Sequence, residues 1–132
     1  MAGKIIADTL EHSTAGSVTT DYVVNGSAKA WVNFNGSGTI ASRDSVNISS
    51  LDDDGTGIFG TNFTSSFDSV NYAQSAICGN EASSSATSIQ VRGYAQTTTT
   101  SASAINTFYS TSSTTASTDQ THNAVIYHGD LA

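Results

Sequence analysis

Three consecutive acids, Asp52, Asp53 and Asp54, are the residues of this chain whose type and spacing suggest metal chemistry. Carboxylate oxygens beside a glycine-containing turn are ligands that Ca²⁺ accepts. The EF-hand spacing is not met, because no Glu follows at the required distance. The alternative is a solvated hairpin turn over residues 52–57, in which Asp and Gly adopt the required backbone angles. We favour the turn, and we expect no metal and no cofactor.

The three histidines, His12, His122 and His128, lie too far apart in the sequence for a local zinc motif. In a strand that runs far enough, His122, Ile126, His128 and Asp130 would share one face. His128 is then a candidate for a subunit interface that titrates near neutral pH, or for a metal held where three symmetry-related copies meet. The simpler expectation is that these histidines are partly exposed or hydrogen-bonded.

Residues for catalysis are sparse. There is no G-x-S-x-G motif, and in a chain so rich in Ser any Ser/His/Asp triple would arise by chance. Asp68, Glu81 and Asp119 fall in predicted loops and could converge as a pair of glycosidase carboxylates. The single cysteine, Cys78, excludes an internal disulfide and is expected to be a small buried hydrophobe. We therefore predict that the protein is not an enzyme.

The composition argues against several kinds of partner. Ser and Thr number 41 of the 132 residues, and charged residues make up only 11%, against about 25% in an average domain. The net charge is −7, and the four basic residues are scattered. Nucleic acids and anionic membranes attract clustered Lys and Arg, so we predict neither partner. No apolar run is long enough for a membrane-spanning helix, and the first residues lack the apolar segment of a secretory signal.

Short apolar runs separated by Gly, Asn, Asp and Ser clusters indicate the fold class. Such runs, repeating every eight to twelve residues or so, predict an all-β antiparallel fold. We expect one β-sandwich or jelly-roll-like domain of about eight strands over residues 28–132. The predicted strands are 30–35, 39–42, 46–51, 58–64, 72–79, 89–96, 105–110 and 122–129. The predicted turns are 36–38, 43–45 and 52–57, and residues 111–121 form the predicted exposed tip.

Residues 1–27 differ from the rest and predict an N-terminal arm. Ile5, Ile6 and Leu10 precede a Ser/Gly-rich connector, and Val18 and residues 22–24 follow it. A helix through Ile5, Ile6 and Leu10 is not supported by a capping box. We expect an extended arm with one or two short strands that packs on a neighbouring subunit or a partner protein. An ordinary first strand of the same sandwich is the alternative.

Four aromatic residues are candidates for exposed positions on the sheets. Alternation places Val32 and Phe34 on the core side of their strand, and Trp31 on the other side. Tyr94, Tyr109 and Tyr127 are expected on solvated faces as well. Aromatic side chains with a polar tip are favoured in subunit contacts and in sugar binding. We predict subunit contacts for these residues, with a glycan platform as the alternative.

Several short motifs follow one another in an order that resembles a known family. They are AWVNFNG at 30–36, DSVNISS at 44–50, the acidic Gly turn, NFT at 62–64 and NYA at 71–73. The resemblance is to a β-domain of bacteriophage tail-fibre and other virion-surface proteins, notably of phages that infect aquatic bacteria. It covers residues 28–79 well and the rest of the chain only in general character.

The resemblance implies a non-enzymatic structural protein on the exterior of a tailed-phage virion, often a homotrimer and made in the host cytoplasm. One placement is a short tail-fibre, tip or adaptor protein, with a host surface glycan as a candidate ligand. The alternative placement is a capsid decoration or head-fibre protein. In either case the arm would contact other virion proteins. A free carbohydrate-binding module is a further alternative.

Overall fold

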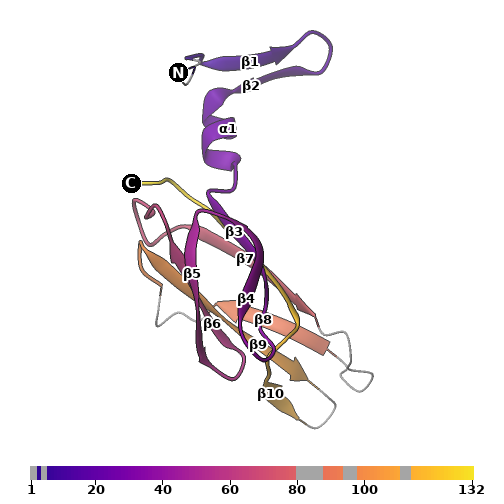
Figure 1. The fold of residues 1–132 in the computed structure, drawn as a ribbon. Helices are drawn as coiled ribbons and strands as arrows, with labels where there is room; N and C mark the ends of the chain where they lie inside the picture. The colour runs from indigo at the N-terminus through magenta and orange to yellow at the C-terminus, as the bar shows by residue number, and fades with distance from the viewer. Residues whose placement is uncertain (1–2, 4–5, 80–87, 94–97, 111–113) are drawn as a thin grey trace.

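Two antiparallel β-sheets face each other in the computed structural model of the chain, and an N-terminal arm projects from one end (Figure 1). The structure describes residues 3, 6–79, 88–93, 98–110 and 114–132, with only the backbone of 88–93. The predicted all-β antiparallel sandwich is confirmed.

The first sheet contains the strand that the sequence predicted most clearly. Its order is β4-β3-β11-β7, formed by β4 (Ala41–Val46), β3 (Ala30–Asn35), β11 (His122–His128) and β7 (Ala73–Gly79). Buried and half-buried residues alternate along β3, so that Val32 and Phe34 point into the core. We call the side of this sheet that points away from the core the outer face.

The second sheet supplies the other half of the core. Its order is β10-β9-β6-β5, and β8 also pairs with β9. The strands are β5 (Ile48–Gly55), β6 (Ile58–Phe63), β8 (Ser88–Gly93), β9 (Ala102–Ser110) and β10 (Thr115–Ser117). β5 and β4 are therefore strands at the edges of their respective sheets.

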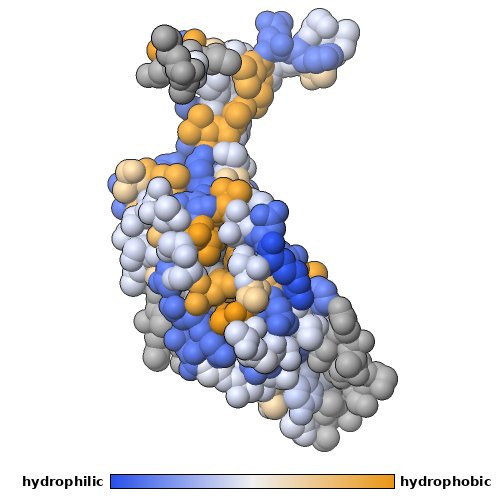
Figure 2. All heavy atoms as spheres, viewed as in Figure 1, coloured by the Kyte–Doolittle hydropathy of each residue, from blue (hydrophilic) through white to orange (hydrophobic). Residues whose placement is uncertain are grey.

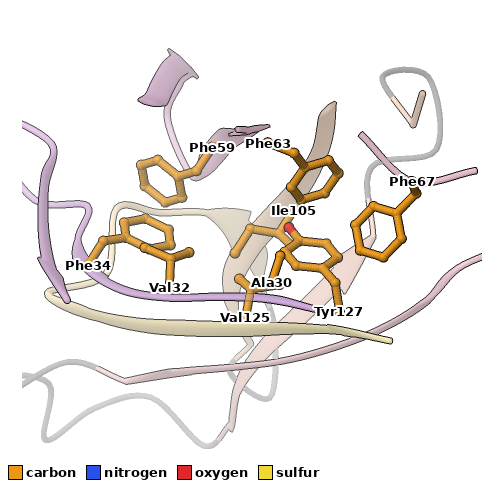
Figure 3. Packing of buried hydrophobic residues seen from close by; sticks show 9 residues of the cluster. All are labelled: Ala30, Val32, Phe34, Phe59, Phe63, Phe67, Ile105, Val125 and Tyr127. Carbon is orange, nitrogen blue, oxygen red and sulfur yellow. The ribbon is translucent and has the colours of Figure 1, made fainter. Parts of the chain in front are cut away.

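Aromatic side chains fill the space between the sheets (Figure 3). Phe34 and Phe59 meet edge to face with ring centroids 5.3 Å apart, and Phe63 and Tyr127 do so at 4.9 Å. Each such pair contributes about 0.5–1.5 kcal/mol beyond its buried area. The buried hydrophobic cluster is Ala30, Val32, Phe34, Phe59, Phe63, Phe67, Ile105, Val125 and Tyr127.

Three predicted loops turn out to contain strands. Residues 43–45, predicted as a turn, lie inside β4. The predicted turn at 52–57 is shorter, because β5 continues to Gly55 and β6 begins at Ile58. The predicted tip at 111–121 contains β10, and Gln120 is buried. Polar residues are compatible with these strands because edge positions leave much of each side chain in water.

The arm consists of a hairpin and a short helix. Strands β1 (Thr9–His12) and β2 (Gly16–Thr19) pair antiparallel, and α1 (Thr20–Gly26) follows directly. The two short strands were expected, but residues 22–24 were expected to be extended and are helical instead. From 6 to 28 every residue is exposed except the half-buried Thr20.

The body has two distinct ends (Figure 1). The arm joins β3 at the same end where the C-terminal residues lie, and there Phe67 forms an isolated β-bridge with Leu131. The β3–β4 and β5–β6 turns lie at the opposite end. At that end Gly57, with φ of 69°, donates its N–H to Asp119 Oδ1 over 2.6 Å, which ties two connections together.

Candidate interaction surface

An apolar row crosses the outer face of the first sheet. Trp31 of β3 lies in register with Val46 of β4 on one side and with Ile126 of β11 on the other. Residues paired across strands point to the same face of a sheet. Val46 and Ile126 are exposed, and Trp31 is half-buried between them. Trp31 thus lies on the outer face, as predicted, at the centre of the row.

A shallow hollow lies beside this row. It has a volume of about 220 Å³, and its lining includes Asn33, Ile77, His122 and Ala124. Arg43 closes one side by donating from Nη1 to Asn33 Oδ1 at 3.2 Å and from Nη2 to the carbonyl of Thr121 at 2.6 Å. Together the row and the hollow form an apolar surface with a polar margin, which is the composition of a protein interface.

The histidines are not brought together. His122 and His128 both lie on the outer face of β11, as predicted, but six residues apart, or roughly 20 Å along a strand. His12 belongs to the arm, where its Nδ1 accepts a hydrogen bond from the N–H of Ala15 at 3.1 Å. Within the described ranges, no group of three or more His, Cys, Asp or Glu residues is placed to hold a metal ion.

The three acids Asp52, Asp53 and Asp54 lie on the edge strand β5. Asp52 Oδ2 accepts a hydrogen bond from Asn62 Nδ2 at 2.6 Å, and Asp53 Oδ1 accepts one from the N–H of Gly55 at 3.3 Å. All three side chains are exposed. Charged residues on an edge strand discourage pairing with another chain, and this accounts for the acids better than metal binding does.

Tyr127 was predicted on a solvated face, and this prediction is wrong. Its side chain is fully buried, and its hydroxyl oxygen lies 2.6 Å from Thr61 Oγ1 on the opposite sheet. Burial raises the pKa of Tyr127 to about 12. Strand β11 is apolar on both faces, so alternation alone did not distinguish its core side from its outer side.

The other predicted contact residues are spread over the molecule. Tyr109 is half-buried on β9, opposite Ala116 of β10. Ile6 and Leu10 are exposed on the arm, and Leu10 pairs with Val18 across the hairpin. Ile5 and Tyr94 lie outside the described residues.

An open seam between the sheets was not predicted. Ile40, Ile48 and Leu51 line a groove of about 320 Å³ between the edge strands β4 and β5, and serines form its margin. Figure 2 shows apolar side chains gathered over this part of the body. The groove lies where the edges of the two sheets run beside each other. Local sequence patterns do not predict which strand edges become neighbours.

The candidate acidic residues Asp119 and Asp68 bond to different parts of the chain. Asp119 accepts the hydrogen bond from Gly57, whereas the N–H of Asp68 donates to the carbonyl of Asp130 beside the C-terminus. Glu81 lies outside the described residues. Cys78 is half-buried, not buried as predicted, and burial raises the pKa of its thiol, which keeps it protonated at neutral pH.

Comparison with protein-family models, with curated proteins and with solved structures found no match to this chain. Among the described residues, no helix has the length and apolar character needed to cross a membrane.

Proposed function

We propose that the protein is a structural component of a tailed-bacteriophage virion, exposed on the particle surface as a short tail-fibre, tip or adaptor protein. The observation that carries this proposal is the contrast between its two parts. The body has a filled aromatic core, whereas residues 6–28 bury no side chain completely (Figures 1 and 2). A folded body with an uncovered arm suits a subunit that attaches to a larger assembly.

The arm has little to stabilise it alone. An isolated two-stranded hairpin is marginally stable in water, and so is a helix much shorter than about 12 residues. Helix α1 has seven residues, and its N-cap residue Thr19 makes no side-chain capping hydrogen bond. Exposed Leu10, Tyr22 and Val24 add apolar surface that a partner would cover. The partners we propose are further copies of the chain, as a homotrimer, and other virion proteins reached through the arm.

The phage assignment draws on the sequence resemblance. The AWVNFNG motif forms β3, with Trp31 on the outer face and Phe34 in the core. The four basic residues are scattered along the sequence, which favours protein or glycan partners over nucleic acid, and we propose no catalytic activity. A capsid decoration or head-fibre protein remains the second candidate, because a short arm on a small body also suits a subunit that studs a capsid.

Deletion of residues 1–24 tests the attachment role. The truncated protein should keep its β-sheet circular dichroism spectrum and unfold cooperatively, but it should no longer associate with particles. The control is Val70→Asp in the full-length chain, which changes an exposed residue outside the arm and should leave attachment intact. Truncated protein that still associates with particles would contradict the proposal.

Copy number on the intact particle separates the two placements. Quantitative mass spectrometry against the major capsid protein should give tens of copies or fewer for a tail component, and hundreds for a decoration protein. Imaging of labelled particles would locate the copies directly.

A further inference from the structure

We infer that helix α1 of one copy docks across the apolar row Val46–Trp31–Ile126 on the outer face of a second copy. The inference deepens the proposed function, on which it rests, by naming the first partner of the arm. The hairpin at the far end of the arm stays available to other virion proteins.

Helix α1 has the surface that such a contact needs. Asp21 and Asn25 are four residues apart and form a polar stripe along one side of the helix. Tyr22, Val23 and Val24 occupy the rest of the circumference together with Thr20 and Gly26. All three apolar side chains are exposed, Val24 by 56%. A short helix of this kind becomes stable when its apolar side is packed against another surface.

The row on the outer face matches the helix in size. Seven helical residues extend about 10 Å, at a rise of 1.5 Å per residue. The row crosses three strands, and two spacings between neighbouring strands also measure about 10 Å. Val46 is 47% exposed and lies beside Trp31, the residue type most often found at the energetic centre of interfaces.

The charges around the row are few and of both signs, so they allow a helix with a single acidic residue to approach. Asp21 is the one charged residue of α1, and it lies three residues before Val24, on a neighbouring part of the helix surface. On the outer face, Arg43 is held beside the row by Asn33. Asp44 of β4 pairs with Asn33 and lies on this face as well, so the row has one basic and one acidic neighbour, whereas the acids of β5 belong to the other sheet.

The connection between arm and body directs α1 away from the row of its own chain. Lys29 fixes this connection, since its N–H donates to the carbonyl of Tyr127 at 2.9 Å and its Nζ donates to the carbonyl of Val24. Ser27 Oγ also donates to the carbonyl of Val24, at 3.1 Å. The helix is therefore held beyond the end of the sheet, as Figure 1 shows, and a second copy must supply the row.

The contact is heterologous, because α1 and the row are different surfaces of the same chain. Each copy that docks its helix leaves its own row open for another copy. Repetition of such a contact closes into a ring when the rotation per copy permits it, and a ring of three is compatible with the proposed homotrimer.

Matched valine substitutions test this contact in the full-length chain. Val24→Asp alters the helix, Val46→Asp alters the row, and Val70→Asp is the control with 51% exposure in a loop. Analytical ultracentrifugation should show that the wild type and the control self-associate at micromolar concentration. The helix and row variants should each dissociate at least about tenfold more readily, because each buries an unpaired charge on docking.

Mixing the two defective variants distinguishes this arrangement from others. The helix variant keeps a working row and the row variant keeps a working helix, so the mixture should form a dimer that neither forms alone. Arm-to-arm or face-to-face association would give no such complementation. A wild type that is monomeric at micromolar concentration would overturn the inference, and so would association that Val24→Asp leaves unchanged.

Tryptophan fluorescence gives an independent readout, because Trp31 is the single tryptophan of the chain. Dilution of the wild type should shift its emission to the red and increase quenching by acrylamide as the row becomes exposed. If Val24→Asp no longer self-associates but still attaches to particles, the docking site is correct. The attachment role proposed for the N-terminal arm is then retained as well. Loss of particle attachment by the 1–24 deletion, together with a monomeric wild type, would retain the attachment role of the arm and overturn the docking site and the homotrimer.

Discussion

The hydroxyl oxygens of Tyr127 and Thr61 lie 2.6 Å apart in the core and join β11 of one sheet to β6 of the other. Thr61 Oγ1 also lies 3.1 Å from the carbonyl oxygen of Ser103, to which it donates. Both side chains are buried and cannot bond to bulk water. These hydrogen bonds therefore satisfy the hydroxyl of Tyr127, the one phenol of the buried hydrophobic cluster.

The two partners of this pair should not be equivalent on substitution. Tyr127→Phe leaves Thr61 bonded to Ser103 and should cost about 1 kcal/mol of unfolding free energy. Thr61→Val removes the partner that lies 2.6 Å from the buried phenol and also the donor to the carbonyl of Ser103, and it should cost about 1–3 kcal/mol. Urea unfolding measures both, with Tyr22→Phe on the exposed arm as the control. Equal losses would mean that the Ser103 side chain satisfies the phenol when Thr61 is replaced.

Alkaline pH should weaken the fold through the same phenol. Burial raises the pKa of Tyr127 to about 12 in the folded chain, whereas an unfolded Tyr titrates near 10. The folded state therefore retains this proton more tightly. The corresponding stability, at most about 3 kcal/mol, is present below pH 10 and is lost as the pH rises to about 12.

Chemical denaturation across this range checks the effect. The stability advantage of the wild type over Tyr127→Phe should shrink and then reverse above pH 10, because the variant has no buried phenol to ionise. An advantage that stays constant up to pH 12 would contradict the assignment.

Two glycines with similar backbone angles should respond differently to alanine. Gly57 and Gly38 have φ of 69° and 72°, so both substitutions carry the cost of about 1 kcal/mol for a left-handed non-glycine residue. A Cβ at Gly57 would lie 2.4 Å from the carbonyl oxygen of Thr107, whereas at Gly38 it would meet open space. Thermal unfolding should show a clearly larger loss for Gly57→Ala. Similar losses at both sites would mean that the backbone around Thr107 relaxes freely.

The three acids on β5 should prevent this edge strand from pairing with another chain. Replacing Asp52, Asp53 and Asp54 together by Asn removes three charges from an exposed edge strand, and we expect more aggregation on heating. Light scattering during a thermal ramp measures this, and Asp21→Asn on the arm is a control for the loss of charge. Addition of Ca²⁺ to the wild type should leave Tm unchanged. A rise in Tm that the triple variant lacks would favour the metal site instead.

Sequence patterns located the strands whose two sides differ in polarity. Strand β3 has the bounds and the inward side that alternation predicts, and Trp31 lies on its outer side. Strand β4 was predicted only in part, as 39–42, because residues 43–45 have the composition of a turn, although an edge strand tolerates them. Helix α1 was missed because Val23 and Val24 are β-branched, which favours strands in the absence of other signals.

Only part of the candidate interaction surface could be predicted from the sequence. Trp31 was found because its neighbours along the strand are polar or core-facing, but its contacts with Val46 and Ile126 depend on pairing between distant segments. Tyr127 was placed on the wrong side because β11 is apolar on both. Which side of such a strand faces the core is decided by the opposite sheet, here by Thr61 and the aromatic cluster.

The base of the arm and the C-terminus lie at the same end of the body, and this gives the molecule a direction. A particle that binds the arm would leave the β3–β4 turn at the far end of the body, with Gly38 facing open space. A foreign peptide spliced into that turn would be presented to the medium, whereas a tag fused after Ala132 would crowd the anchoring side.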